Sequence, residues 1–379
     1  ITLLARLLET IEGFVPHTMD QWRKAAYTKS MKCRSVTEHR DVITVVVLMT
    51  LVSVTCGVIS AQPEPAGTVA PAHFHHLHLN SVNPAAAVEF YVSAFSSVTK
   101  TSFAGFEGIR TKSRVSPRPG NVYLLFTKVA KPPATQPQSA IWHFGWNTPD
   151  SRQYLNRFRD MNLTIMKMYG DPEGTLIDIS SDGLPGYLTK TQIAEARTTG
   201  TTPTRIGGFQ YLGGPDGALV ESYGNFPAER FTHVHLYHED PVCAQQWYAR
   251  HLGATVAATH LHLGPGEQED DTCTEPYPES YVEPTYPGFF REGVPREPSG
   301  YVLFDDIGLP IRPFRGPFVS TRGQTVDHIA LSVGNLPSTL DRLRRAGITV
   351  VEEIHPWGQT RAAMIEAPDR LLLELIEIS

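Results

Sequence analysis

One order of predicted elements, a strand, then a helix and then further strands, recurs four times along the chain. The opening strands are "FHHLHLN" (74–80), "AIWHFGWN" (140–147), "FTHVHLYHED" (231–240) and "TVDHIALSVGN" (325–335), and a helical pattern follows each. A unit of this size cannot bury its apolar face alone, so the repeats must pack against one another. We therefore predict an α+β fold of four βαβββ repeats, paired in two domains.

Two of the opening strands are rich in histidine. "HFHHLHLN" starts at His73 and "HVHLYHED" starts at His233, and both alternate polar with apolar residues as a half-buried strand does. Residues two apart in a strand share a face, so His76 and His78 lie together, as do His233 and His235. Imidazoles on an inward face indicate a site, whereas His73 and His75 are expected at the surface, where the strand begins.

The composition excludes several classes of protein. The chain has 379 residues, 41% of them hydrophobic and 19% charged, which is ordinary for globular domains. With 33 basic and 39 acidic residues the net charge is −6, and the sequence has no basic run or basic-aromatic stripe. We therefore expect a small-molecule substrate and no nucleic acid partner. The oligomer, monomer or homodimer, stays open.

The N-terminal part has the composition of an export signal. Residues 1–30 precede Met31 and are set aside as an upstream segment. Residues 31–61 have a basic start, an uncharged apolar run (42–59) and small residues at the end, which is typical of a signal peptide; an uncleaved membrane anchor stays open. Residues 62–71 form a Pro-rich linker. We predict an exported protein, periplasmic or secreted, that contacts the membrane only if the segment stays uncleaved.

The predicted export can be measured directly. Residues 31–61 fused to a reporter that is active only outside the cytoplasm should give reporter activity, because a basic start and an apolar run direct translocation. The same fusion with two lysines placed in the apolar run is the matched control and should be inactive. An inactive parent fusion would refute the prediction.

Two long segments interrupt the repeats, and two cysteines lie in the later part. Residues 180–204 are predicted to hold a short helix near 192–196, and the acidic, Tyr-rich residues 263–300 are either a disordered insertion or a lid that includes Tyr281. Cys243 and Cys273 could form a disulfide in an oxidising compartment, or could be two unrelated thiols.

Four motifs resemble one known family. The segments 232–254 and 326–348 are similar to its opening strand, helix and Leu-Gly or Ala-Gly close, and "GPDGALVESYG" (214–224) and "APDRLLLELIE" (367–377) are similar to its closing hairpin. The family is the vicinal oxygen chelate superfamily of glyoxalases, bleomycin resistance proteins and extradiol dioxygenases. The resemblance covers residues 72–379 and implies a first module at 72–226 and a second at 227–379.

The resemblance also implies metal ligands from the first, fifth and last strands of each module. It assigns His76, His143 and Glu221 to the first module, and His233, His328 and Glu374 to the second. Two imidazoles and a carboxylate suit a divalent ion such as Fe²⁺, Mn²⁺ or Zn²⁺ and leave positions open for substrate. In the alternative interpretation the glutamates end edge strands at the surface. Candidate acid or base groups are His78, His235 and His355.

The implied function is a metal-dependent enzyme that binds a small molecule through two adjacent oxygens. The reaction is either oxygen insertion, as in a dioxygenase, or lyase or isomerase chemistry, as in a glyoxalase. The first module lacks the further acid of glyoxalase I in "VYLLFTKV" (122–129), and no histidine precedes Tyr211 as in the dioxygenase signature. The long second-module loop, with His235 and His355 as possible proton carriers, favours a second module that is at least as active as the first. The alternative function is metal-free binding of an antibiotic or another small molecule.

Overall fold

The computed structural model describes residues 69–112, 121–170, 176–178, 198–199, 209–224, 226–257, 273–274, 277, 290–291 and 299–378. All of them belong to one compact unit, residues 64–379. The predicted signal segment, the helix at 192–196 and Tyr281 lie outside the described residues. Among the helices that are described, none has the length and apolar character needed to span a membrane.

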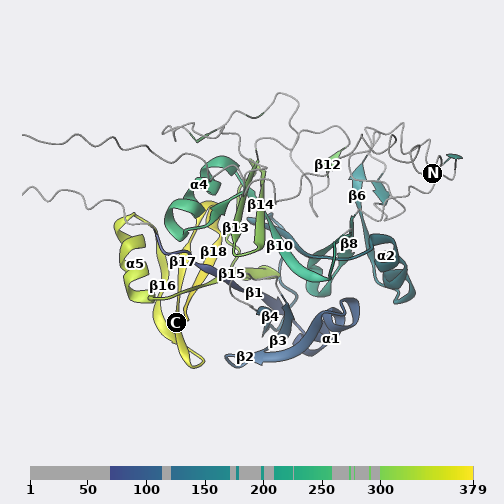
Figure 1. The fold of residues 1–379 in the computed structure, drawn as a ribbon, viewed down its shortest axis with the longest axis horizontal. Coiled ribbons are helices and arrows are strands. Elements are labelled where there is room, and N and C mark those ends of the chain that lie inside the picture. Colours follow the sequence, from purple (N-terminus) through teal and green to yellow (C-terminus); the bar gives the residue numbers. More distant parts are fainter. Residues whose placement is uncertain are drawn as a thin grey trace, which may run out of the picture. The chain divides into compact units, whose positions relative to one another are not determined.

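The described strands form two large sheets, and the α+β prediction is confirmed (Figure 1). The eight-stranded sheet has the order β16-β17-β18-β15-β1-β4-β3-β2, and the path of the ten-stranded sheet is β11-β13-β14-β10-β5-β9-β8-β6-β12, with β7 paired to β6. The first sheet consists of β1 (His73–Ser81), β2 (Val98–Phe103), β3 (Phe106–Lys112), β4 (Asn121–Lys128), β15 (Val326–Val333), β16 (Val350–Trp357), β17 (Thr360–Glu366) and β18 (Leu372–Glu377). The second consists of β5 (Ile141–Asn147), β6 (Ile165–Gly170), β7 (Leu176–Asp178), β8 (Phe209–Gly213), β9 (Leu219–Tyr223), β10 (Arg230–His238), β11 (Thr255–Val256), β12 (Phe290–Arg291), β13 (Gly300–Phe304) and β14 (Ile307–Pro313).

Each sheet combines one repeat from the first half of the chain with one from the second half. We number the repeats 1 to 4 in chain order. Repeats 1 and 4 build the eight-stranded sheet, in which β1 pairs antiparallel with β15, and repeats 2 and 3 build the other, in which β10 pairs antiparallel with β5. Figure 1 shows β1, at the purple end of the colour scale, beside the yellow-green β15. Pairing therefore runs 1 with 4 and 2 with 3, and no sheet is built from one contiguous half.

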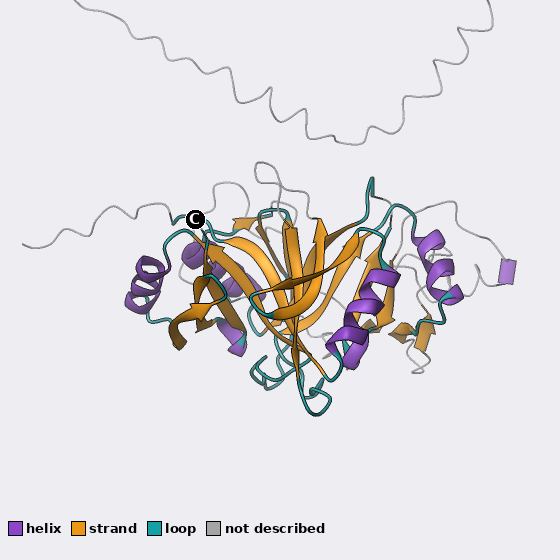
Figure 2. Cartoon of the chain, turned by 90° about the horizontal axis from the view of Figure 1, so that it is seen from below, coloured by secondary structure: helices purple, strands orange, loops and turns teal. Residues whose placement is uncertain are grey.

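Helices lie outside the strands (Figure 2). They are α1 (Pro84–Ala94), α2 (Ser151–Asp160), α4 (Pro241–Leu252) and α5 (Leu336–Arg345). Helix α1 begins where Asn83 accepts a hydrogen bond from the Ala86 N–H, and Asn335 caps α5 in the same way. Helix α4 ends at Gly253, whose φ of 68° suits glycine.

The main core lies on the face of each sheet that is opposite the histidines. Leu77 and Leu79 of β1 are buried in it, and the Phe74 ring contacts Phe231 of β10 at 5.9 Å between ring centroids. Phe95 stacks on the fully buried Trp146 at 4.3 Å. Burying such aromatic rings contributes most of the apolar area that holds repeats together. The alternation in β1 and β10 consequently turns their site histidines to the other face.

A disulfide joins Cys243 to Cys273. Cys243 lies in the first turn of α4, and Cys273 belongs to the long segment after β11. Of the two possibilities left open by the sequence, the structure therefore has the bridge.

Candidate metal centres

Cluster 1 is the group His76, His78, His328 and Glu374 on the eight-stranded sheet. One carboxylate oxygen, Glu374 Oε2, lies 3.5 Å from His76 Nε2 and 3.7 Å from His328 Nε2. All four residues are buried. These three atoms and His78 Nδ1 are buried without a hydrogen bond. Four such polar atoms in one place need a partner, and a cation supplies one.

Cluster 2 is the group His143, Glu221, His233 and His235 on the ten-stranded sheet. Glu221 Oε2 accepts hydrogen bonds from His143 Nε2 at 2.8 Å and from His233 Nε2 at 3.0 Å. The ligand atoms of the four residues lie within 4.8 Å of one another. The same residue types as in cluster 1 therefore meet here, but the carboxylate is closer to its imidazoles.

The grouping of ligands expected from the two halves of the chain is wrong. His76 meets His328 and Glu374, and His233 meets His143 and Glu221. The reason is the pairing of β1 with β15 and of β10 with β5, which sends each opening-strand histidine into a sheet shared with the other half. All six predicted ligands lie in one of the two clusters. Each cluster, however, combines ligands from both predicted modules. Glu221 and Glu374 are buried, which excludes the alternative of surface glutamates.

The strands that carry the two clusters pair in the same way, so that equivalent positions face each other in both sheets. His76 pairs with Ala330, which pairs with Glu374, and His233 pairs with Gly145, which pairs with Glu221. A Cβ at Gly145 would come within 2.6 Å of the Glu221 carbonyl oxygen and 2.8 Å of His233 Cε1. Glycine at this position therefore allows the closer approach of carboxylate and imidazole in cluster 2.

Gly145→Ala should destabilise the protein by about 1 to 3 kcal/mol, the usual cost of overpacking, and should weaken metal binding in cluster 2. The reciprocal variant Ala330→Gly is the matched control, because it should cost only about 1 kcal/mol and leave cluster 1 intact. Urea unfolding together with zinc content measures both effects. A Gly145→Ala protein of parental stability and zinc content would contradict this account.

An irregularity in each opening strand adds a neighbour to the first ligand. The register shifts between Phe74 and His76, which buries His75 on the site face, and its Nδ1 lies 2.9 Å from His76 Nδ1. The expectation that His75 is at the surface is therefore wrong, while His73 is partly exposed and contacts Asp305. In cluster 2 the corresponding residue is Thr232, whose hydroxyl lies 3.0 Å from His233 Nδ1 and donates to Asn147.

Asp327 orients the second ligand of cluster 1. Its Oδ1 lies 2.7 Å from His328 Nδ1, and its Oδ2 accepts hydrogen bonds from Gly323 N–H and Asn80. A carboxylate on the far nitrogen fixes the ring of a ligating histidine. Asp327 is not predictable from the strand pattern, because strict alternation puts the residue before His328 on the other face. A register shift there changes its direction.

Burial and neighbouring charges set the protonation of these groups. Burial lowers the pKa of His78 to about 3 and that of His143 to about 4, and it lowers the pKa of His76 well below its usual range. Burial also disfavours charge on His328, but the Asp327 hydrogen bond and the Glu374 carboxylate outweigh it and raise this pKa to about 9. Burial raises the pKa of Glu221, yet His233 and His143 outweigh it and hold it well below the usual range. Neutral imidazoles and ionised carboxylates are the forms that bind metal.

Aromatic side chains wall the clusters. Trp357 stacks on His76 at 5.5 Å, and Phe106 meets His78 edge-on at 4.7 Å. In cluster 2, Tyr211 and Trp142 contact the His143 ring edge-on. Apolar rings therefore contact the histidines of each cluster.

His355 is not among the clustered residues. It lies on β16, and its Nδ1 is 3.0 Å from the carbonyl oxygen of its neighbour Glu353. The metal-binding groups found among the described residues contain His78 and His235 but omit His355. Its proposed role in proton transfer stays a prediction.

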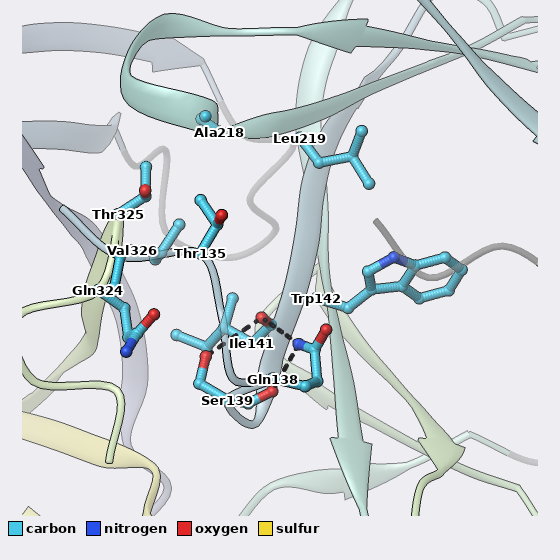
Figure 3. A pocket seen from close by; sticks show the side chains of 12 residues that line it. Thr135, Gln138, Ser139, Ile141, Trp142, Ala218, Leu219, Gln324, Thr325 and Val326 are labelled. Carbon is cyan, nitrogen blue, oxygen red and sulfur yellow. Dashed lines mark hydrogen bonds between the residues drawn. The ribbon is translucent and has the colours of Figure 1, made fainter. Parts of the chain in front are cut away.

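A separate pocket lies where the segment before β5, the Pro215–Gly217 turn and the segment before β15 meet (Figure 3). The Gln138 amide in its wall donates to the carbonyl oxygens of Ser139 and Ile141. The residues that line it include no member of either cluster. We assign no chemistry to this pocket.

The donor sets fit a divalent ion. Each cluster offers imidazole nitrogens and a carboxylate oxygen, the ligand types that Zn²⁺, Fe²⁺ and Mn²⁺ accept in proteins. In cluster 1 the convergence of buried nitrogen and oxygen atoms without hydrogen bonds is the structural observation that supports this fit. Fold and site together define a protein with paired βαβββ repeats and histidine-carboxylate centres.

The sequence motifs resemble the vicinal oxygen chelate superfamily, and one family model matches the later part of the chain. Residues 230–375 match the profile of the Glyoxalase/Bleomycin resistance protein/Dioxygenase superfamily. Among solved structures, glyoxalase I from Zea mays is 11% identical with a TM-score of 0.49, covering 81% of this chain and 92% of the maize chain. The fosfomycin resistance protein FosX from Listeria monocytogenes, solved with Mn(II), is 13% identical with a TM-score of 0.25, covering 38% of this chain and 88% of its own. No curated protein matches this sequence significantly.

Proposed function

We propose that this protein is a metal-dependent enzyme acting on a small molecule that it binds through two adjacent oxygens. The observation that carries the proposal is cluster 1, where His76, His328 and Glu374 converge on one buried point without hydrogen bonds at the converging atoms. In cluster 2 the ligands are His143, His233 and Glu221. An ion held there would act as a Lewis acid that polarises substrate oxygens.

The residues around each ion hold the ligands and exclude water. Asp327 and His75 orient the rings of His328 and His76 in cluster 1, and Thr232 orients His233 in cluster 2. The stacked Trp357 covers the first ligand and keeps the local dielectric low. A buried, preoriented ligand set strengthens the interaction with charge that develops on a substrate oxygen.

The protein should bind up to two divalent ions per chain and should melt at a higher temperature when loaded. Ions that bind only the folded state stabilise it by mass action. Anaerobic reconstitution with Fe²⁺, Mn²⁺ or Zn²⁺, followed by elemental analysis and calorimetry, measures this. Oxygen-uptake and aldehyde-conversion screens then separate dioxygenase from glyoxalase or lyase chemistry. A protein that takes up no ion and keeps its melting temperature would refute the proposal.

The alternative is a metal-free binding protein for a small molecule such as an antibiotic. The observation in its favour is that Glu221 Oε2 is already hydrogen-bonded by His143 Nε2 and His233 Nε2, so these three atoms have partners without an ion. The same elemental analysis distinguishes the two functions, because a binding protein would take up ligand without metal.

We also propose that the protein is exported and that one chain is sufficient for both centres. The Cys243–Cys273 disulfide supports export, because disulfides persist mainly in oxidising compartments. Both clusters take all their ligands from a single chain, which supports a functional monomer.

A further inference from the structure

We propose that His78 and His235 are metal ligands rather than proton carriers, so that each centre has three imidazoles and one carboxylate. This inference rests on the proposed function in one respect, that the clusters bind a divalent ion. It changes the number of coordination positions left for substrate and thereby the class of reaction.

In cluster 1 the geometry of His78 leaves one nitrogen for the ion. Its Nε2 lies 2.7 Å from the Thr127 hydroxyl, while its Nδ1 is buried without a hydrogen bond. Ligand atoms of His76, His78 and His328 lie within 4.8 Å of one another. The His78 ring stacks on the His328 ring at 4.7 Å with an interplanar angle of 23°.

Cluster 2 repeats the arrangement on a different sheet. His235 pairs with His143 as His78 pairs with His328, and the rings stack at 4.3 Å with an angle of 22°. All four residues of cluster 2 present ligand atoms within 4.8 Å of one another. Both sheets thus place the same third imidazole at the same register.

The burial of these nitrogens favours coordination. A buried nitrogen without a partner costs about 1 to 3 kcal/mol, and cluster 1 has three such imidazole nitrogens together with a carboxylate oxygen. One ion satisfies all four atoms at once. An ion held only by His76, His328 and Glu374 would leave the buried His78 Nδ1 without a partner.

Four protein ligands would leave a six-coordinate ion such as Mn²⁺ only two open positions. A substrate with two adjacent oxygens would fill both and leave none for a co-substrate such as dioxygen. The inferred ligand set therefore favours lyase or isomerase chemistry, in which the ion stabilises charge on substrate oxygens, over oxygen insertion.

Imidazole ¹⁵N NMR of the wild-type protein titrated with Zn²⁺ tests the inference without a mutation. The Nδ1 resonance of His78 should move to the metal-bound range together with the resonances of His76 and His328. Uptake of zinc without a shift at His78 Nδ1 would overturn the inference and leave the proposed function standing. Failure of the wild-type protein to take up zinc would refute the proposed function itself.

Variants provide a second measurement. His78→Gln should weaken zinc binding in cluster 1 more than a hundredfold, whereas Thr127→Val, which removes only the hydroxyl behind the ring, should stay within the ten- to hundredfold usual for such neighbours. His73→Gln, on the same strand but outside the cluster, is the control. Unchanged zinc affinity in folded His78→Gln contradicts the inference; if this variant fails to fold, the NMR titration decides.

Discussion

Glu374→Ala combined with His233→Ala should remove both metal ions from the chain, whereas Glu374→Ala combined with His76→Ala should remove only one. Glu374 and His76 belong to cluster 1, and His233 belongs to cluster 2. A second ligand lost from an already broken centre removes nothing more, because such effects are not additive. Zinc content per chain after reconstitution measures the difference.

The turnover rate of double variants provides a second measurement of which ligands belong to which cluster. Loss of the ion from the working centre should reduce the rate by several orders of magnitude, since Lewis-acid stabilisation is worth several kcal/mol. Glu221→Ala with His233→Ala tests cluster 2 and matches Glu374→Ala with His76→Ala. The double variant that retains turnover identifies the idle centre. If Glu374→Ala with His76→Ala removed two ions, ligands would be grouped by contiguous halves and the structure would be wrong on this point.

The sequence predicts the ligand types well because they follow from local pattern. The alternation in "HFHHLHLN" and "HVHLYHED" places His76 and His233 on one face, and the closing hairpins place Glu374 and Glu221 on the last strand of a repeat. The strand, helix and hairpin patterns likewise identify four repeats, which the structure confirms.

The partners of each ligand are not predictable in this way. His76 and His328 become neighbours only because β1 pairs with β15, a strand some 250 residues later. The same four repeats could pair 1 with 2 and 3 with 4 without any change in local propensity. The choice between these pairings depends on how whole repeats pack, as in the contact of Phe74 with Phe231. A short sequence motif does not determine which repeats pair.

Register shifts account for the neighbours that were missed. A strand of strict period 2 sends His75 and Asp327 away from the site, and one extra residue in the strand turns each toward its ligand. Gly145 is a similar case, since its role depends on the position of Glu221 across the sheet. In the sequence "HFGWN" that glycine has no visible function.

The metal-free protein should lose stability steeply as the pH falls below 6.5. Burial lowers the pKa of His75 and His143 to about 4, that of His78 to about 3, and that of His76 well below its usual range. Below pH 6.5 the unfolded chain takes up protons at these histidines and the folded chain does not. Each therefore costs about 1.4 kcal/mol per pH unit until its folded pKa is reached.

The opposite sign applies to His328. Its pKa is raised to about 9 in the folded protein, so its contribution to stability is complete below pH 6.5 and is lost as the pH rises through 9. Stability without metal should therefore be highest near neutral or slightly acidic pH. Urea unfolding in chelator at about pH 7 and about pH 5 should differ by roughly 5 kcal/mol or more, which is comparable with the whole stability of a domain.

Removal of one buried histidine should reduce the stability that the metal-free protein loses per pH unit below pH 6.5. His78→Gln is expected to reduce its slope by about 1.4 kcal/mol per pH unit, because one proton fewer distinguishes the unfolded chain from the folded one. The matched control His73→Gln replaces a partly exposed histidine of the same strand that lies outside the cluster. Equal slopes in both variants would mean that the His78 ring is not buried in the neutral form, and the wall that Phe106 forms beside it would then have to open in solution.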